Sequence, residues 1–338
     1  MGRKTATRKF SAARGTQIPA AAMTAGVAGL LLAAWLIYGT VSVDPFRWGV
    51  FAEELIVSLC ALFALRLLCV IRLPKWIPLA CIVLLPAAIS LWGARFLPED
   101  PAAFGRALCL AAATAFALLA ALQLDAKPDG VLAAAILAAF CAPVLLAAQT
   151  LFIEELMRAL VMAGVFFTVL AARRKTVVYS YLAAALFGLA GTAGFSAAFA
   201  GAGAGIGAAL LAPKRNRGSW IFAAVLMAAL PLVGRILAAG RLPASSPLFA
   251  GSALQIGAFA SLIQTHLLRA LALGLAAMSV RFFFSREDAA VPAVLALAGC
   301  AAARLIPFAA APDVWMDALP LCALAGVGVA KAARGKAR

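Results

Sequence analysis

The sequence has few charged residues. They make up 12% of its 338 positions, whereas soluble globular proteins have about 25%. Long polar stretches occur only at the termini, and the other polar stretches are short loops. This pattern excludes a soluble domain of any size. Hydrophobic residues make up 65% of the chain. Apolar runs of about 20 residues, the length that a membrane-spanning helix needs, follow one another almost from end to end. The sequence therefore predicts an all-α fold, a single helical bundle embedded in a membrane.

Histidine is almost absent, since His266 is the only one. A single histidine cannot form a His-rich metal centre. The seven cysteines lie in or beside apolar runs, and none belongs to a CxxC pair or a Cys/His cluster, so neither a zinc site nor a disulfide framework is predicted. The sequence also has no nucleotide-binding loop. We therefore expect no metal and no cofactor, and the sequence leans away from an enzyme.

Acidic residues are scarce as well, at 13 against 29 lysines and arginines, which leaves a net charge of +16. All eight lysines fall in segments that we expect on one side of the membrane, as the excess of basic residues in cytoplasmic loops predicts. This distribution argues against a nucleic-acid partner. The expected partner is the lipid bilayer, with attraction to anionic lipid headgroups on the cytoplasmic face.

The apolar runs predict about ten to twelve spanning helices. Nine runs read as single spans, near residues 19–38, 51–71, 76–96, 103–123, 131–150, 150–175, 219–239, 290–307 and 314–331. Residues 176–212 contain no charge and are long enough for two helices with a tight break near 191–196. Residues 248–284 are long for one span, which leaves the total number of spans open.

The basic loops also predict an orientation. Twenty of the 29 lysines and arginines fall in alternate loops and the two tails, and nine of the 13 acids fall on the opposite side. Both termini are therefore predicted to be cytoplasmic. Residues 1–17 and 332–338 would be basic tails that flank one transmembrane domain at 18–331. A bacterial cytoplasmic membrane is the expected location, and an organellar transit peptide of similar composition remains an alternative for the N-terminal tail.

Two segments of the sequence resemble each other and suggest an internal repeat. FAEEL at 51–55 resembles FIEEL at 152–156, and each is followed by an apolar run and a basic stop. Three repeat units, near 20–125, 128–214 and 219–331, would account for this spacing. Internal repeats are common in transporters, where they build a site at their interface. Coincidence in a chain made of few residue types is the alternative.

The candidate site consists of ionisable residues within or beside predicted spans. Inserting such residues into a bilayer costs free energy, so their presence there usually indicates a functional role. The strongest candidates are Glu154, Glu155 and Arg158, at the start of the 150–175 run. Glu154 and Arg158 are four residues apart, the favourable spacing for a helical ion pair. The remaining candidates for a polar path are Glu53, Glu54, His266 and Arg269. A structural role is the alternative for each, as a self-neutralising pair near the interface or as a snorkelling arginine.

Four glycines lie in the segment GAGAGIGAALLA, at Gly201, Gly203, Gly205 and Gly207. Small residues spaced four apart let two helices approach closely within a membrane. We therefore expect these glycines to form a helix-packing face.

Residues 150–233 resemble the CPBP family, the Abi or CAAX-protease-like intramembrane proteins. The family shows EExxxR at the start of a span, then FxxxH, a small basic turn and HxxxN. Here EELMR at 154–158 is one residue short, and FGLAG at 187–191 has Gly191 where the histidine would stand. The span after the turn NRGSW has neither histidine nor asparagine. In that family glutamates and histidines organise the reactive water, so the resemblance implies a catalytically dead relative, with chance as the alternative.

These observations favour a transporter-like or flippase-like membrane protein. Its substrate would pass along a small-residue-lined path near residues 150–212, with Glu154, Glu155 and Arg158 as polar contacts. Two alternatives stay open. One is a membrane-embedded enzyme, such as a degenerate intramembrane protease that uses the same acidic pair. The other is a non-catalytic scaffold whose charges only set the topology.

Overall fold

The computed structural model describes residues 74, 76–95, 100–124, 128–147, 152–194, 196–239, 289–304 and 318–334. Every regular element in these ranges is a helix. The α-helices are α3 (Ile77–Ala94), α4 (Pro101–Leu124), α5 (Pro128–Ala147), α6 (Phe152–Arg174), α7 (Val178–Ala193), α8 (Ser196–Leu210), α9 (Arg217–Ala239), α12 (Val291–Arg304) and α13 (Ala318–Arg334). A short 3-10 turn, η1 (Lys214–Asn216), precedes α9. The helices predicted near 19–38, 51–71 and 248–284 lie outside the described residues.

The all-α prediction is confirmed, and the helix ends fall within a few residues of the predicted ones. The charge-free segment 176–212 divides as expected, because α7 ends at Ala193 and α8 begins at Ser196. Gly194 between them adopts an extended backbone. Two short helices separated by a tight break therefore replace what could have been one long helix.

Within the described residues, four helical stretches are long and apolar enough to cross a membrane: 77–94, 101–124, 152–174 and 214–238. Shorter apolar helices, including α7, α8 and part of α12, pack among them. This is the composition of a membrane-embedded helical protein, because a helix satisfies its own backbone hydrogen bonds where no water is available. The total of ten to twelve spans and the cytoplasmic placement of both termini stay predictions.

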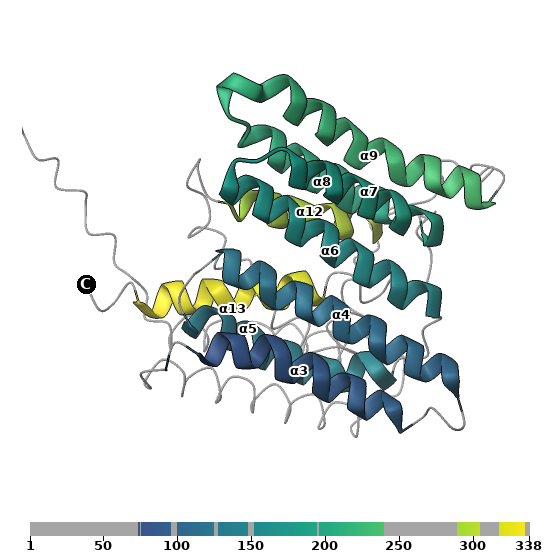
Figure 1. Ribbon diagram of the computed structural model, residues 1–338, viewed down its shortest axis with the longest axis vertical. Helices are drawn as coiled ribbons and strands as arrows, with labels where there is room; N and C mark the ends of the chain where they lie inside the picture. The colour runs from purple at the N-terminus through teal and green to yellow at the C-terminus, as the bar shows by residue number, and fades with distance from the viewer. Residues whose placement is uncertain are drawn as a thin grey trace, which may run out of the picture.

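The helices lie side by side in a slab (Figure 1). Along one face of the slab the order is α3, α4, α6, α7 and α9, each packed against the next. Helix α8 packs between α9 and α12, and α13 packs against α5 and α4. Helix α6 is therefore the central element, with α4 on one side and α7 on the other.

One end of the slab is strongly basic, and we call it the basic end. It comprises the α6–α7 turn with Arg173–Lys175 and the α8–α9 turn with Lys214–Arg217. Arg173 donates hydrogen bonds to the carbonyl oxygens of Leu122 and Gln123, which places the C-terminus of α4 at this end too. Helices α4 and α6 therefore run parallel, as two spans separated by one other span must. The opposite end, which we call the acidic end, holds the N-termini of α4 and α6 and the α7–α8 turn.

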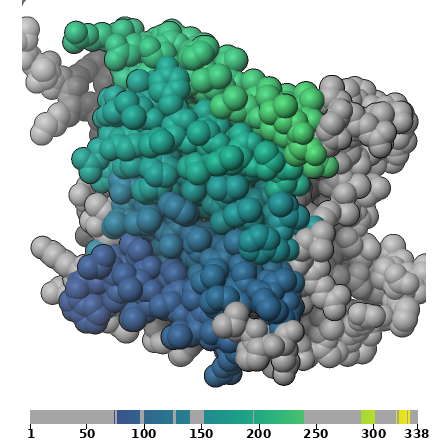
Figure 2. All heavy atoms as spheres, turned by 45° about the vertical axis from the view of Figure 1, so that its right-hand side comes forward, coloured from purple at the N-terminus to yellow at the C-terminus, as the bar shows by residue number. Residues whose placement is uncertain are grey.

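The two outer helices present apolar surfaces. Leu84 and Leu91 of α3 are 65% and 72% exposed, and Phe222 and Leu237 of α9 are 57% and 78% exposed. Figure 2 shows α3 and α9 at opposite edges of the molecule. Large apolar residues on the outside of a helical slab are the surface that lipid tails solvate, so these two faces support placement in a bilayer.

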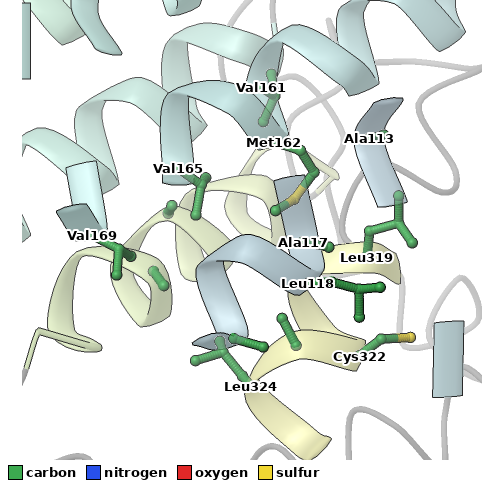
Figure 3. Close-up of a cluster of buried hydrophobic side chains, with 14 of the residues drawn as sticks. Ala113, Ala117, Leu118, Val161, Met162, Val165, Val169, Leu319, Cys322 and Leu324 are labelled. Carbon is green, nitrogen blue, oxygen red and sulfur yellow. The ribbon is translucent and has the colours of Figure 1, made fainter. Parts of the chain in front are cut away.

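The core lies between the two outer helices. Side chains of α4, α6 and α13 meet there, among them Leu118, Met162, Val165 and Leu319, all 2% exposed or less (Figure 3). Alanine supplies many of the remaining core positions, such as Ala113 and Ala117. Small residues let helices approach closely, which matters in a membrane because burying apolar surface there gives little driving force.

Helix α6 ends in a left-handed residue that is not glycine. Lys175 has φ 52°, and the Thr176 N–H donates back to the Ala171 carbonyl oxygen at 3.3 Å. This is the Schellman arrangement, whose left-handed position is usually glycine because a Cβ is strained there. A basic side chain at this site adds favourable charge at a helix C-terminus and at the basic end.

We expect Lys175→Gly to raise the free energy of unfolding by up to about 1 kcal/mol, because glycine removes the strain at the left-handed position. Arg174→Gly, one residue earlier in regular helix, should lower it by a similar amount. Unfolding by sodium dodecyl sulfate in mixed micelles, followed by circular dichroism, measures both. Equal effects of the two variants would contradict the Schellman assignment.

Helix α4 begins with a carboxylate cap. Asp100 Oδ1 accepts a hydrogen bond from the Ala103 N–H at 3.0 Å, and Oδ2 pairs with Arg106 Nη2 at 3.1 Å. The backbone hydrogen bond from Ala103, followed by the hydrogen bond and charge of Arg106, holds the pKa of Asp100 below its usual range. The cap satisfies an N–H group that a helix N-terminus otherwise leaves without a partner.

A carboxyl group with a lowered folded-state pKa stabilises the fold above its unfolded pKa, about 3.9, and loses that effect as the pH falls through its folded pKa. Asp100→Ala should therefore lower the melting temperature at pH 7 and lose less further stability than the parent below pH 4. Asp100→Asn keeps a capping oxygen but not the charge, so it should fall between the two. Thermal melts from pH 3 to pH 7 test this order. Equal pH profiles for the parent and Asp100→Ala would refute it.

Candidate functional site

A buried ion pair occupies the acidic end of α6. Arg158 Nη1 donates a hydrogen bond to Glu155 Oε2, and the two side chains are only 3% and 2% exposed. Glu154 is also buried, at 7% exposed. The sequence favoured an ion pair between Glu154 and Arg158, and the structure shows a hydrogen bond from Arg158 to Glu155, three residues before it. Both spacings place the two residues on one helix face, so local sequence alone does not choose between them.

The position of the pair follows from the core-facing stripe of α6. Arg158 lies four residues before Met162 and seven before Val165, which places the three on one face of the helix. Met162 and Val165 point into the apolar core (Figure 3). The ion pair therefore lies on the core-facing side of α6, about one helical turn from Met162 toward the acidic end.

The guanidinium of Arg158 is incompletely satisfied. Its Nε atom is buried and has no hydrogen-bond partner; the Ser180 hydroxyl oxygen, near the basic end, is the other such atom in the described part of the chain. By contrast, the buried hydroxyls of Thr114 and Thr168 donate to carbonyl oxygens four residues earlier, at 2.8 and 2.7 Å. A buried donor without an acceptor costs about 1–3 kcal/mol, so Arg158 is an energetic exception among the buried polar groups.

The α7–α8 turn contacts Met157, the residue before Arg158, and lies deeper in the bundle than the N-terminus of α6. A Cβ built on Gly194 would lie 2.5 Å from the Met157 sulfur, and the Ser196 hydroxyl is 3.9 Å from the same atom. Met157 is five residues into α6, which corresponds to about 7 Å along its axis. The turn is therefore recessed into the bundle, and Ser196 is only 2% exposed. The apolar sequence around these residues gave no signal of this depth.

On the other side of α6, the pair faces α4. The Glu155 carboxylate lies within electrostatic reach of the Cys109 sulfur. A Cβ on Gly105 would lie 3.0 Å from the Phe152 ring, so the first turns of α4 and α6 pack closely. The first turns of α4 and α6 therefore pack against each other on the side of α6 where Glu155 lies.

The four candidate glycines pack against two helices rather than one. Cβ atoms on Gly201 and Gly205 would lie 2.2 and 2.8 Å from carbonyl oxygens of α9, at Met227 and Ala224. A Cβ on Gly203 would lie 2.0 Å from the Leu295 carbonyl oxygen of α12, and one on Gly207 would lie 2.5 Å from the Cα atom of the α12 residue Pro292. Alternate glycines face opposite sides of α8, so this helix is held by close backbone contacts on both sides.

The other candidates from the sequence, Glu53, Glu54, His266 and Arg269, lie outside the described residues, so they stay predictions. Across the ranges that the structure describes, no group of three or more histidine, cysteine, aspartate or glutamate side chains could hold a metal ion.

Fold and site together define a helical membrane protein that carries a buried ion pair within one of its spanning helices. Comparison with protein-family models, curated proteins and solved structures gave no match for this chain. Its function is therefore inferred from the arrangement of its own residues.

Proposed function

We propose that this is a multi-pass, transporter-like or flippase-like protein of a bacterial cytoplasmic membrane. Its substrate would move along α6, α7 and α8 and contact Glu154, Glu155 and Arg158. The observation that carries the proposal is the buried Glu155–Arg158 pair, with its unpartnered Nε donor, inside a helix long enough to span the membrane.

An ionisable side chain within a span costs about 2.5–3.5 kcal/mol on insertion scales at the helix centre, and such residues usually mark substrate paths or proton relays. Three of them lie within five residues of one another in α6. Other charges within the described helices, such as Arg106 and Arg235, are only partly buried, whereas Glu155 and Arg158 are each 2% exposed. Burial of this ion pair inside the bundle favours contact with a substrate over a role in topology alone.

The short helices α7 and α8 give further support. Transporters commonly build their sites where helices are interrupted within the membrane, because irregular backbone is tolerated only where it is buried in protein or lines a cavity. The recessed turn at Gly194 and Ser196 is such an interruption, and it lies beside Met157, the neighbour of Arg158.

The membrane-enzyme alternative has less support. At Gly191, the position where CPBP proteins have a histidine, a Cβ would lie 2.2 Å from the Pro231 carbonyl oxygen and 2.3 Å from its Cα. Side chains larger than hydrogen do not fit there without separating α7 from α9. A relative of that family with this packing has lost the place for the histidine, not only the residue.

The proposal includes an orientation. Arg173, Arg174, Lys175, Lys214, Arg215 and Arg217 are all exposed on the two turns of the basic end. We propose that this end faces the cytoplasm and the anionic headgroups of the inner leaflet. The acidic end would then face outward.

Thiol labelling tests the proposal in a cysteine-free background. Glu154→Cys should react with a membrane-impermeant maleimide added to intact cells, since the path is expected to hold water. Ala117→Cys, which replaces a core alanine that is 1% exposed, is the unreactive control. Ser219→Cys, exposed at the basic end, should react only in inside-out vesicles. If Glu154→Cys reacts no more than Ala117→Cys from either side of the membrane, the scaffold alternative is favoured instead.

A further inference from the structure

We propose that Arg158 is the subsite for an anionic oxygen group of the transported molecule, a carboxylate or a phosphate. When no ligand is bound, Glu155 accepts a hydrogen bond from one nitrogen of the guanidinium, Nη1. This inference rests on the proposed transport function and names the chemical class of the substrate.

The geometry of the guanidinium suits an oxyanion ligand. Arginine has five N–H donors and no acceptor, arranged so that two of them can grip one oxyanion side by side. Glu155 binds Nη1. The edge formed by Nε and Nη2 does not include Nη1, and the Nε donor on that edge has no partner. Arg158 can therefore keep its bond to Glu155 while its other edge receives an oxygen acceptor.

The chemistry of the unsatisfied atom decides the sign of the ligand. Arg158 is 2% exposed, and its guanidinium carries only hydrogen-bond donors. A buried donor on a permanent cation is satisfied best by a charged acceptor, because charge-assisted hydrogen bonds are roughly twice as strong as neutral ones. A cationic ligand would leave Nε without an acceptor.

Glu155 then has a definite role as an internal competitor. Its carboxylate stabilises Arg158 in the empty state and repels an approaching anion at the same time. Neutralising Glu155 while keeping its size and its hydrogen-bond acceptor should therefore raise the affinity for anions. Glu155→Gln is that change, because the glutamine oxygen can still accept from Nη1.

The experiment uses the full chain in nanodiscs of zwitterionic phosphatidylcholine and follows the melting temperature during titration with inorganic phosphate or acetate. We expect Glu155→Gln to bind one of these anions at least about tenfold more tightly than the parent, because a like charge next to the ligand has been removed. The double variant Glu155→Gln/Arg158→Gln should not respond. Its neutral amide pair replaces both charges of the pair, so neither member of the pair is left as a buried charge without the other. Arg174→Gln, which removes an exposed arginine, should behave like the parent.

A second arm separates the sources of the anion. Nanodiscs that contain phosphatidic acid replace the soluble probes. Stabilisation of Glu155→Gln by phosphatidic acid alone would identify a lipid headgroup as the ligand and favour a flippase, whereas stabilisation by soluble phosphate or acetate indicates a free solute. If Glu155→Gln does not fold, the parent and the double variant are compared at higher anion concentration, and only the parent should respond.

Equal responses of the Arg158-containing proteins and the double variant to every anion would overturn the inference. The proposed function fails separately, through unreactive cysteines along the path. A reactive Glu154→Cys together with no anion response would mean a path for a substrate of another chemistry.

Discussion

Glu155→Leu is expected to lower the free energy of unfolding by about 3–5 kcal/mol, the usual cost of removing one partner of a buried ion pair. The guanidinium of Arg158 would remain buried at 2% exposure without its acceptor. Unfolding by sodium dodecyl sulfate in mixed micelles measures the loss.

The reverse replacement, Arg158→Leu, should cost less than Glu155→Leu. Glu155 lies in the first turn of α6, where the positive end of the helix dipole stabilises a negative charge. The double variant Glu155→Leu/Arg158→Leu removes both charges of the pair and is expected to be the most stable of the three. If both single variants and the double variant lost the same stability, the two side chains would not be a buried pair.

Gly203→Ala is expected to lower the free energy of unfolding by about 1–3 kcal/mol, as overpacking of a close contact does. The added Cβ would lie 2.0 Å from the Leu295 carbonyl oxygen, and backbone cannot rotate away as a side chain can. Helices α8 and α12 must therefore separate, which also disturbs the contact of Gly299 with the Phe199 carbonyl oxygen, 2.1 Å from the corresponding Cβ position.

Gly218→Ala is the matched control. A Cβ on Gly218 meets nothing within 4 Å, and the residue lies in the first turn of α9. Alanine is the better helix former by about 1 kcal/mol in a helix interior. The same substitution should thus have opposite signs at the two positions, and a stabilising Gly203→Ala would contradict the close packing of α8 on α12.

The helices could be predicted because their signal is local. Runs of apolar residues bounded by basic loops located α3 to α9, α12 and α13 to within a few residues. The break at Gly194 followed from a segment too long for one helix and containing no charge. Membrane helices are predictable in this way because each must satisfy its own backbone hydrogen bonds along a fixed length.

The site could be predicted only in part, because its geometry depends on helices distant in the sequence. Glu154, Glu155 and Arg158 stand out as charges in an apolar run, but the hydrogen bond between Arg158 and Glu155 depends on side-chain packing around α6. The glycine segment predicted close packing, whereas its division between α9 and α12 follows from where those two helices lie. The depth of the α7–α8 turn likewise depends on how α7 and α8 pack against Met157.

The most direct test of the transport proposal is the sidedness of labelling at Ser196→Cys. This position lies at the recessed turn beside the ion pair and leaves Glu155 and Arg158 intact. A protein that exposes its site alternately to each side predicts labelling by an impermeant maleimide in both right-side-out and inside-out vesicles, with Ala117→Cys unlabelled in both. Absence of labelling from either side, with Ser219→Cys reactive as a positive control, would contradict a substrate path at this site.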